Sequence, residues 1–266
     1  MNRLEASISL LIITLYASVQ YVFLRGIPEG TSDFAFMMVT NLMGFLIMLF
    51  TFSGELGRLD RKQVLESFFL SLFLFGMNLF LLLGAQGVSS TTAASVLSAY
   101  FLFVMLFGIL FYRQKPAGHQ LAGMSLVLCG LFFMMDLDIH SLFCKDILYL
   151  LLADMFFALY ILKAAEYASD SNPAVLCMGQ MFFTFLLSLA GWRCETLVRE
   201  IPMMLPQDPA FYRSVIFISI FIRGLYGIIQ IYAQRYVSAL EASMIFASEI
   251  VMTTLLSPVL SRLLGT

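Results

Sequence analysis

Three charged residues lie near the middle of long apolar segments of the sequence: Asp154, Arg223 and Glu249. A charge costs about 2.5–3.5 kcal/mol at the centre of a membrane-inserted helix, so a charge at that depth predicts a functional role. Burial in an apolar cavity disfavours a carboxylate's charged form, which suits an acid that takes up and releases a proton. We therefore expect Arg223 to bind an anionic substrate group, or to be held by one of the two acids, while an acid carries a proton. A buried ion pair that only fixes helix packing stays open as the alternative.

Polar residues follow Arg223 along the same helical segment. They recur at spacings of three, four and four residues: Arg223, Tyr226, Gln230, Gln234. These spacings keep the side chains on one face of a helix, which must point to protein or water. We expect that face to line a cavity.

Candidate contacts for a small-molecule substrate also occur in the first half of the chain: Tyr16, Gln20, Asn78, Tyr100. Tyr16 and Gln20 share a helical face, and aromatic rings can hold an organic cation. The sequence has 27 Phe and 11 Tyr, so a lipid-facing or interface position remains the alternative for any single ring.

The sequence lacks the patterns of an enzyme or a nucleic-acid binder. It has no G-x-S-x-G or H-E-x-x-H motif and no phosphate-binding glycine loop, and we expect no catalytic residues and no cofactor. The four cysteines show no C-x-x-C spacing, so we expect no metal site. The 15 Lys and Arg are scattered and the net charge is −2, which argues against nucleic acid.

The composition predicts an all-α, polytopic transmembrane bundle. Hydrophobic residues make up 61% of the 266 residues and charged residues only 12%, against roughly 25% charged in soluble domains. A bilayer core needs about 20 apolar helical residues per span. Nine segments reach that length, near 5–25, 33–53, 65–86, 90–112, 117–135, 146–164, 173–192, 212–234 and 238–262.

An internal repeat organises these spans. A shift of 148 residues lays Gly76 on Gly224, Ser95 on Ser243 and Asn78 on Tyr226. A shift of 139 lays the first two spans on the sixth and seventh, with Tyr21 on Tyr160. Repeats with an odd number of spans must insert with opposite orientation, which defines an inverted repeat.

We place the two repeats at 1–135, with helices one to five, and 145–266, with helices six to nine. The partner of the fifth helix would begin near position 265, so a tenth helix is expected to be missing, through truncation or in a natural nine-span protein. The distribution of Lys and Arg in the first half favours an N-terminus inside the cell. Small residues such as Gly76, Gly224, Ser95 and Ser243 would let one bundle rock against the other.

Two blocks of sequence resemble the EamA-like family of the drug/metabolite transporter superfamily. Residues 86–100, QGVSSTTAASVLSAY, followed by 113–123, resemble that family's fourth and fifth helices. Residues 232–239, YAQRYVSA, and 247–251, ASEIV, resemble its second repeat, with Ile250 where the family commonly has proline after the glutamate. The resemblance implies ten helices in two inverted five-helix repeats around a central cavity, and transport of small organic solutes.

The combined expectation is a multi-pass protein of the cell membrane that acts as a secondary transporter. We expect it to export small organic metabolites, such as amino acids or drug-like compounds, by alternating access and with proton coupling. Its expected partners are the substrate and the lipid bilayer, with a homodimer left open as the assembly. The alternative is a membrane scaffold or receptor that uses the same fold without transport.

Overall fold

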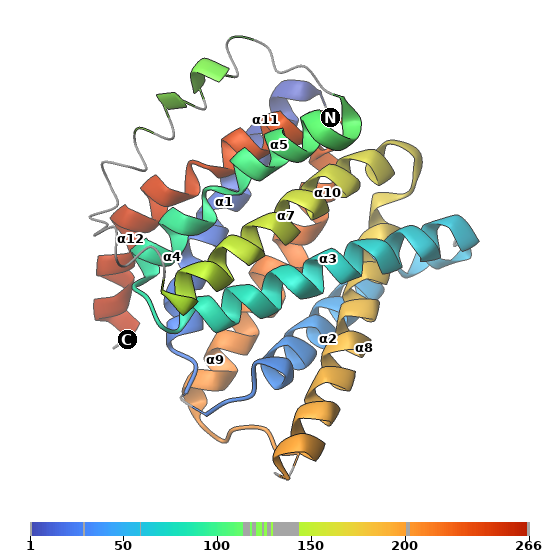
Figure 1. Ribbon diagram of the computed structural model, residues 1–266. Coiled ribbons are helices and arrows are strands. Elements are labelled where there is room, and N and C mark those ends of the chain that lie inside the picture. Colours follow the sequence, from blue (N-terminus) through green and yellow to red (C-terminus); the bar gives the residue numbers. More distant parts are fainter. Residues whose placement is uncertain are drawn as a thin grey trace.

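The computed structural model describes residues 2–28, 30–58, 60–113, 118, 121–123, 125–126, 129, 144–200 and 203–264. This part of the chain is a bundle of helices without strands (Figure 1). The first half contributes α1 (Arg3–Arg25), α2 (Asp33–Phe52), η1 (Ser53–Arg58), α3 (Arg61–Ala85), α4 (Ser90–Leu97) and α5 (Tyr100–Tyr112). The second half contributes α7 (Lys145–Asp170), α8 (Pro173–Arg199), α9 (Pro209–Phe217), η3 (Ile218–Tyr226), α10 (Gly227–Ala233), α11 (Ala239–Phe246) and α12 (Glu249–Leu264).

Eight helical segments of the described residues are long and apolar enough to cross a membrane. The count is therefore eight in this part of the chain rather than the predicted nine. The remaining predicted span, 117–135, lies largely outside the described residues. Two of the eight are each built from a pair of helices, because α4 and α5 share the span Thr92–Tyr112, and α11 and α12 share Ala239–Leu256.

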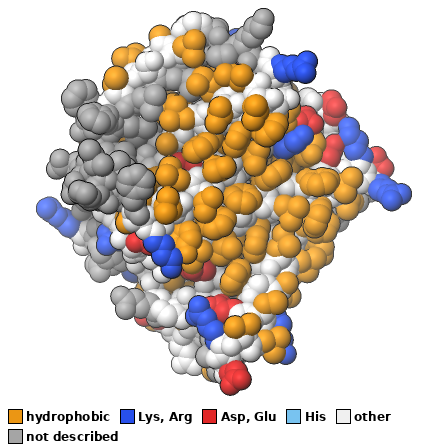
Figure 2. Space-filling view, viewed as in Figure 1, with side chains coloured by type: hydrophobic (Ala, Val, Ile, Leu, Met, Phe, Trp, Pro, Cys, Tyr) orange, Lys and Arg blue, Asp and Glu red, His pale blue; other side chains and the backbone are white. Residues whose placement is uncertain are grey.

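Large apolar side chains are exposed on the outer faces of the bundle. Phe50 is 82% exposed, Leu110 65% and Leu255 69%. Figure 2 shows hydrophobic side chains across the middle of one face, with charged groups gathered toward its margins. A water-soluble protein rarely exposes so large an apolar surface, whereas lipid tails cover one at no cost. The chain is an integral, multi-pass membrane protein.

Side-chain caps begin several helices. Asn2 and Glu5 form a reciprocal capping box at the start of α1, and Ser238 and Glu241 form another at α11. At α8, Asn172 accepts a hydrogen bond from the amide of Ala174 while Pro173 takes the first helical position. These caps satisfy backbone donors that have no partner within the helix.

The burial pattern aligns α1 and α2 with α7 and α8 at a shift of 140 residues. This is one residue more than the shift of 139 predicted from the sequence. All seven buried residues of α2 fall on buried residues of α8 with a shift of 140, against four of seven with 139. With a shift of 140, nine of the ten buried residues of α1 fall on buried residues of α7. Gln20 is therefore equivalent to Tyr160, and the predicted alignment of Tyr21 with Tyr160 is one residue out of register.

α3 is equivalent to the continuous segment made of α9, η3 and α10. The shift that aligns the two changes inside η3, a nine-residue π-helix. Buried residues of α3 up to Gly76 fall on buried residues with a shift of 148, and those from Asn78 onward with a shift of 149. A π-helix accommodates an additional residue within a continuous helix. Asn78 is thus equivalent to Gly227, which corrects its predicted pairing with Tyr226.

The shift of 149 continues into the paired helices. Ser89 and Ser238 are the N-caps of α4 and α11, and both spans then break at equivalent positions. The second half of each span begins at Tyr100 in α5 and at Glu249 in α12. These two residues occupy the same place in the two repeats.

Equivalent helices run in opposite directions. Arg3, at the start of α1, pairs with Glu241 at the start of α11. Arg235, just before α11, donates a hydrogen bond to the carbonyl of Ala168 near the end of α7, at 2.6 Å. The start of α1 and the end of its equivalent α7 therefore lie on the same side of the bundle, which we call the N-terminal side. This is the inverted repeat that the sequence predicts.

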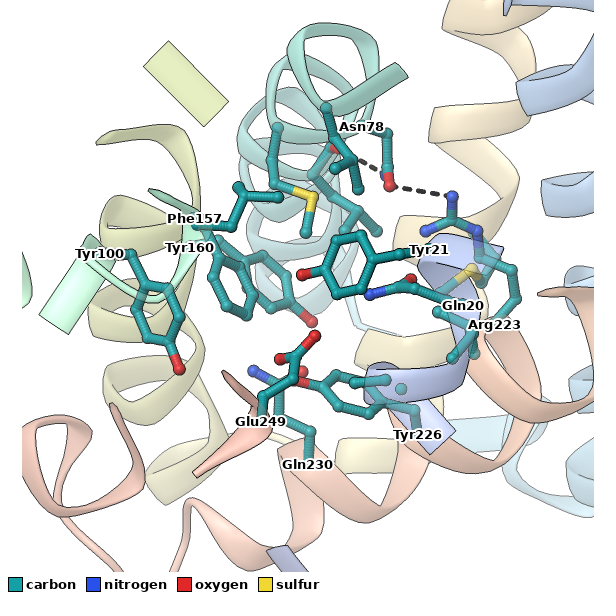
Figure 3. A pocket seen from close by; sticks show the side chains of 18 residues that line it. Gln20, Tyr21, Asn78, Tyr100, Phe157, Tyr160, Arg223, Tyr226, Gln230 and Glu249 are labelled. Atoms are coloured by element: carbon teal, nitrogen blue, oxygen red, sulfur yellow. Dashed lines mark hydrogen bonds between the residues drawn. The ribbon is translucent and has the colours of Figure 1, made fainter. Parts of the chain in front are cut away.

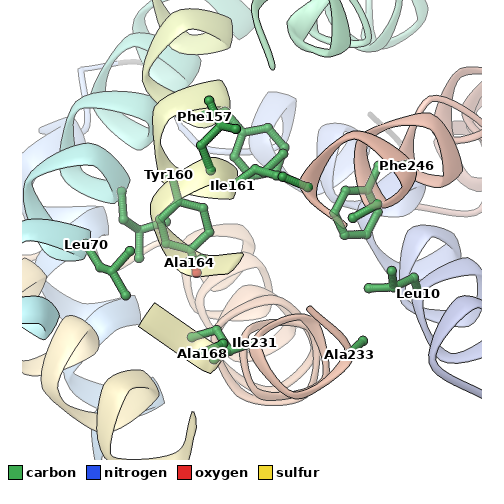
Figure 4. Close-up of a cluster of buried hydrophobic side chains, with 14 of the residues drawn as sticks. Leu10, Leu70, Phe157, Tyr160, Ile161, Ala164, Ala168, Ile231, Ala233 and Phe246 are labelled. Carbon is green, nitrogen blue, oxygen red and sulfur yellow. The ribbon is translucent and has the colours of Figure 1, made fainter. Parts of the chain in front are cut away.

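One buried core joins the two repeats around α7. Figure 4 shows Phe157, Tyr160 and Ile161 of α7 among residues of the neighbouring helices. Leu70 of α3 and Phe246 of α11 belong to the same cluster. Small residues bring helices close, since a Cβ on Gly76 would lie 2.6 Å from the ring of Phe156. The glycine equivalent to it, Gly224, is less constrained, with the nearest atom at 3.4 Å.

Candidate functional site

A cavity lies between the repeats at the middle of the bundle, lined by 18 residues (Figure 3). Fourteen of them form seven equivalent pairs: Ala17 and Phe157, Gln20 and Tyr160, Leu74 and Ile222, Met77 and Tyr226, Asn78 and Gly227, Leu81 and Gln230, Tyr100 and Glu249. The cavity therefore lies at the pseudo-two-fold axis of the inverted repeat. Its free volume is about 50 Å³, enough for a few water molecules.

Arg223 reaches the cavity from the π-helix η3 and is only 6% exposed. Its terminal nitrogen donates a hydrogen bond to Oδ1 of Asn78 at 2.9 Å, and its Nε has no partner among the described residues (Figure 3). No acidic side chain of the described residues forms an ion pair with it. The alternative ion pair with Glu249 or Asp154 is therefore not seen in this part of the chain. The guanidinium is left with donors for another group.

Gly44 of α2 makes room for Arg223. A Cβ at position 44 would lie 2.5 Å from the Cβ of Arg223, a contact that only a shift of the helices could relieve. The close approach of α2 to η3 therefore depends on glycine at this position.

Glu249 projects into the cavity from the first turn of α12 and is 7% exposed. Gln20 and Tyr21 of α1 face its carboxyl group (Figure 3). Its Oε1 has no hydrogen-bond partner among the described residues. The break between α11 and α12 thus places a carboxyl group at the repeat interface, in contact with the opposite repeat.

Asp154 lies outside the cavity lining, although it is fully buried in α7. Neither of its carboxyl oxygens has a hydrogen-bond partner in the described part of the chain. Its equivalent in α1 is Thr14, whose hydroxyl donates to the carbonyl of Leu10 at 2.7 Å. The second repeat therefore buries an acid where the first has a hydroxyl that is hydrogen-bonded within its own helix.

The structure brings together seven of the nine residues predicted from the sequence: Gln20, Asn78, Tyr100, Arg223, Tyr226, Gln230 and Glu249. Besides Asp154, Tyr16 is absent from the lining, because its ring stacks on Phe221 with centroids 5.2 Å apart. The hydroxyl of Tyr100 donates to the carbonyl of Ser243 at 3.3 Å, which links α5 to α11.

Three aromatic residues of the lining were not predicted: Tyr21, Phe157 and Tyr160. Tyr21 and Tyr160 had stood out as a repeat match, but many other aromatic residues in the chain obscured that signal. Phe157 had no signal of its own. No group of three or more His, Cys, Asp and Glu side chains that could hold a metal ion occurs among the described residues.

The sequence matches the EamA-like transporter family over residues 5–136 and 145–262. The chain belongs to the EamA-like transporter family. An uncharacterized transporter of Archaeoglobus fulgidus is 26% identical over 187 residues, which are 70% of this chain and 58% of that protein. One protein crystal structure, with 15% sequence identity, superposes on 95% of this chain and 90% of its own with a TM-score of 0.69. That similarity shows that nearly the whole chain shares its fold with a solved structure.

Proposed function

We propose that this EamA-like protein is a secondary-active transporter that exports small organic metabolites across the cell membrane by alternating access. The observation that carries the proposal is the cavity built from seven equivalent pairs of residues at the axis of an inverted repeat. A site on such an axis can be exposed to either side when one repeat rocks against the other.

The size of the cavity supports movement between states. Pockets for organic ligands usually measure about 300–1,000 Å³, whereas this cavity has a free volume of about 50 Å³. The present conformation is therefore too tight for such a solute, and the repeats must separate on one side to admit it. The two broken spans, at Tyr100 and Glu249, supply places where helices can bend.

The chemistry of the cavity supports an organic solute with polar ends. Arg223 offers unused donors to an anionic group, and aromatic rings such as Tyr160 and Phe157 offer apolar surface. Glu249 can accept a cationic group or carry the coupled proton, since it has a free oxygen and no basic partner among the described residues. Amino acids and amphiphilic drug-like compounds fit this description.

The proposal is tested by uptake into proteoliposomes of purified protein, with and without an imposed pH gradient. The panel contains amino acids, amines, choline-like cations and nucleoside-type metabolites, and empty liposomes are the control. Specific uptake that responds to the gradient supports a coupled transporter and names its substrate class. No uptake of any panel compound by folded, inserted protein contradicts the proposal and favours a scaffold or receptor.

A further inference from the structure

A second hollow, which we call the vestibule, lies on the N-terminal side of the bundle between the ends of α5 and α7 and the segment joining α10 to α11. Its volume is about 480 Å³, nearly ten times that of the central cavity. Its polar lining comes from Tyr112, Glu166, Ser169, Gln234, Arg235, Tyr236 and Ser238.

Both charged residues that line the vestibule already have partners. Glu166 accepts hydrogen bonds from Tyr112 at 2.5 Å and from Lys163 at 2.9 Å. Arg235 is held by the carbonyl groups of Ala168 and Ser171 at the end of α7. These contacts fix the walls and leave Gln234 as the polar residue at the inner end.

Gln234 and Gln230 join the vestibule to the central cavity along one face of the helix. Gln234 lines the vestibule and Gln230 lines the cavity, and four residues of helix separate them by about 6 Å. Both are almost fully buried, with 3% and 1% exposed. Nε2 of Gln234 donates a hydrogen bond to the carbonyl of Ile161 at 3.4 Å, while Oε1 of Gln234 and Nε2 of Gln230 have no hydrogen-bond partner among the described residues.

Helix packing alone does not account for these two amides. A buried amide group without a partner costs about 1–3 kcal/mol, so an apolar residue would pack better. The first repeat has apolar residues at the equivalent positions, Leu81 and Ala85, and both are buried. Other buried amides of the described residues, such as Asn41 and Gln180, also have atoms without a partner, but only Gln230 and Gln234 lie on the line between the two hollows.

We propose that Gln230 and Gln234 form the hydrophilic path between the vestibule and the central cavity, with Gln234 closing it in this conformation. As the repeats separate on the N-terminal side, water, protons and polar solute would hydrogen-bond first to the amide group of one glutamine and then to that of the other. The passage of a solute along this path rests on the proposed function. The accessibility of the path to water does not depend on it.

The test is thiol labelling of Gln234→Cys in a chain whose native cysteines at 129, 144, 177 and 194 are replaced. The matched control is Ala85→Cys, at the equivalent position of the first repeat and 2% exposed. A charged, membrane-impermeant methanethiosulfonate is added to sealed vesicles of known orientation, first to one side and then to the other.

We expect Gln234→Cys to react from the N-terminal side at least about tenfold faster than Ala85→Cys from either side, because opening of the path exposes it. Equal, slow reaction of the two variants overturns the proposal. If Gln234→Cys does not elute as folded protein, Gln230→Cys decides the question. Its reaction from the N-terminal side supports the path, and reaction only from the other side overturns it. Labelling needs no transported solute, so it can fail or succeed independently of the uptake panel.

Discussion

The two repeats agree in burial and differ in chemistry. Seven positions of each repeat meet at the central cavity, and both repeats break a span at the same place. The first repeat brings no charged side chain to the lining, whereas the second brings Arg223 and Glu249. Their equivalents are Phe75 and Tyr100. Under the proposed function, the shared backbone would support exchange between two orientations, and the difference in side chains would determine what the cavity binds.

A π-helix carries one of the two charges that distinguish the second repeat, Arg223. α3 is a regular helix throughout, while its equivalent contains η3, which carries Arg223 at the cavity. Such π-segments recur at functional sites because they redirect side chains without breaking the helix. Tyr226 and Gln230 line the cavity beside Arg223, at positions equivalent to Met77 and Leu81 of the first repeat.

The largest effect on transport is expected from replacing Glu249, the acid at the break between α11 and α12. Glu249→Gln keeps the size of the side chain but cannot release a proton, so gradient-driven accumulation should be lost while exchange of solute across the bilayer continues. Uptake and exchange in proteoliposomes measure the two activities. The control at the equivalent position, Tyr100→Phe, should keep accumulation. Unchanged accumulation in Glu249→Gln would exclude proton coupling through this residue.

Substitution of Arg223, the charged residue on η3, should mainly affect the affinity for the solute. Arg223→Ala should weaken the apparent affinity for a solute with an anionic group by about 2 kcal/mol or more, since that group would lose its charged partner. A smaller loss in Arg223→Lys would show that charge alone matters, and an equal loss would indicate bidentate recognition. Concentration dependence of initial uptake measures both. Phe75→Leu is the control, and an unaltered affinity in Arg223→Ala would remove Arg223 from the binding site.

Equivalent glycines should respond differently to the same substitution. Gly76→Ala should lower stability by about 1–3 kcal/mol, because the new methyl group overlaps the ring of Phe156. Gly224→Ala should be neutral or stabilising, because its surroundings have room and alanine favours the helix. Thermal unfolding of the purified variants in one detergent provides the comparison. Equal melting temperatures would contradict the packing difference between the repeats.

The smallest effect is expected at the first broken span. Tyr100→Phe removes the hydroxyl that donates to the carbonyl of Ser243, which should cost about 0.5–1.5 kcal/mol. The same thermal measurement tests this, with Phe103→Leu on the next turn of α5 as a packing control. A loss as large as that of Gly76→Ala would show that this hydrogen bond matters more than its geometry suggests.

The spans and the polar face were predictable from the sequence because both depend on local patterns. Apolar length identifies a membrane helix, and spacings of three and four residues place Arg223, Tyr226 and Gln230 on one face. These three residues do line the cavity. The repeat was also visible, since Gly76 and Gly224 are identical at equivalent positions, although the predicted pair of Ser95 and Ser243 is one residue out of register.

The register and the partners were not predictable, because they depend on three-dimensional packing. No sequence pattern marks the additional residue of η3, so Asn78 was paired with Tyr226 instead of Gly227. The partner of Arg223 is the amide of Asn78 rather than an acid, and charge counting cannot distinguish the two. Asp154 and Tyr16 have the right residue types but lie outside the lining.

The central claim is that solute passes through the cavity between the repeats, and Gln230→Leu tests it most directly. This variant gives the second repeat the residue of its first-repeat equivalent, Leu81. The initial rate of uptake of the panel's best solute is compared with that of Leu225→Ala, a variant on the same helical segment whose residue is 41% exposed on the outer surface. We predict that Gln230→Leu slows uptake about tenfold, which corresponds to the loss of a hydrogen bond worth about 1.4 kcal/mol, while Leu225→Ala keeps the wild-type rate. Equal rates in the two variants would contradict the account.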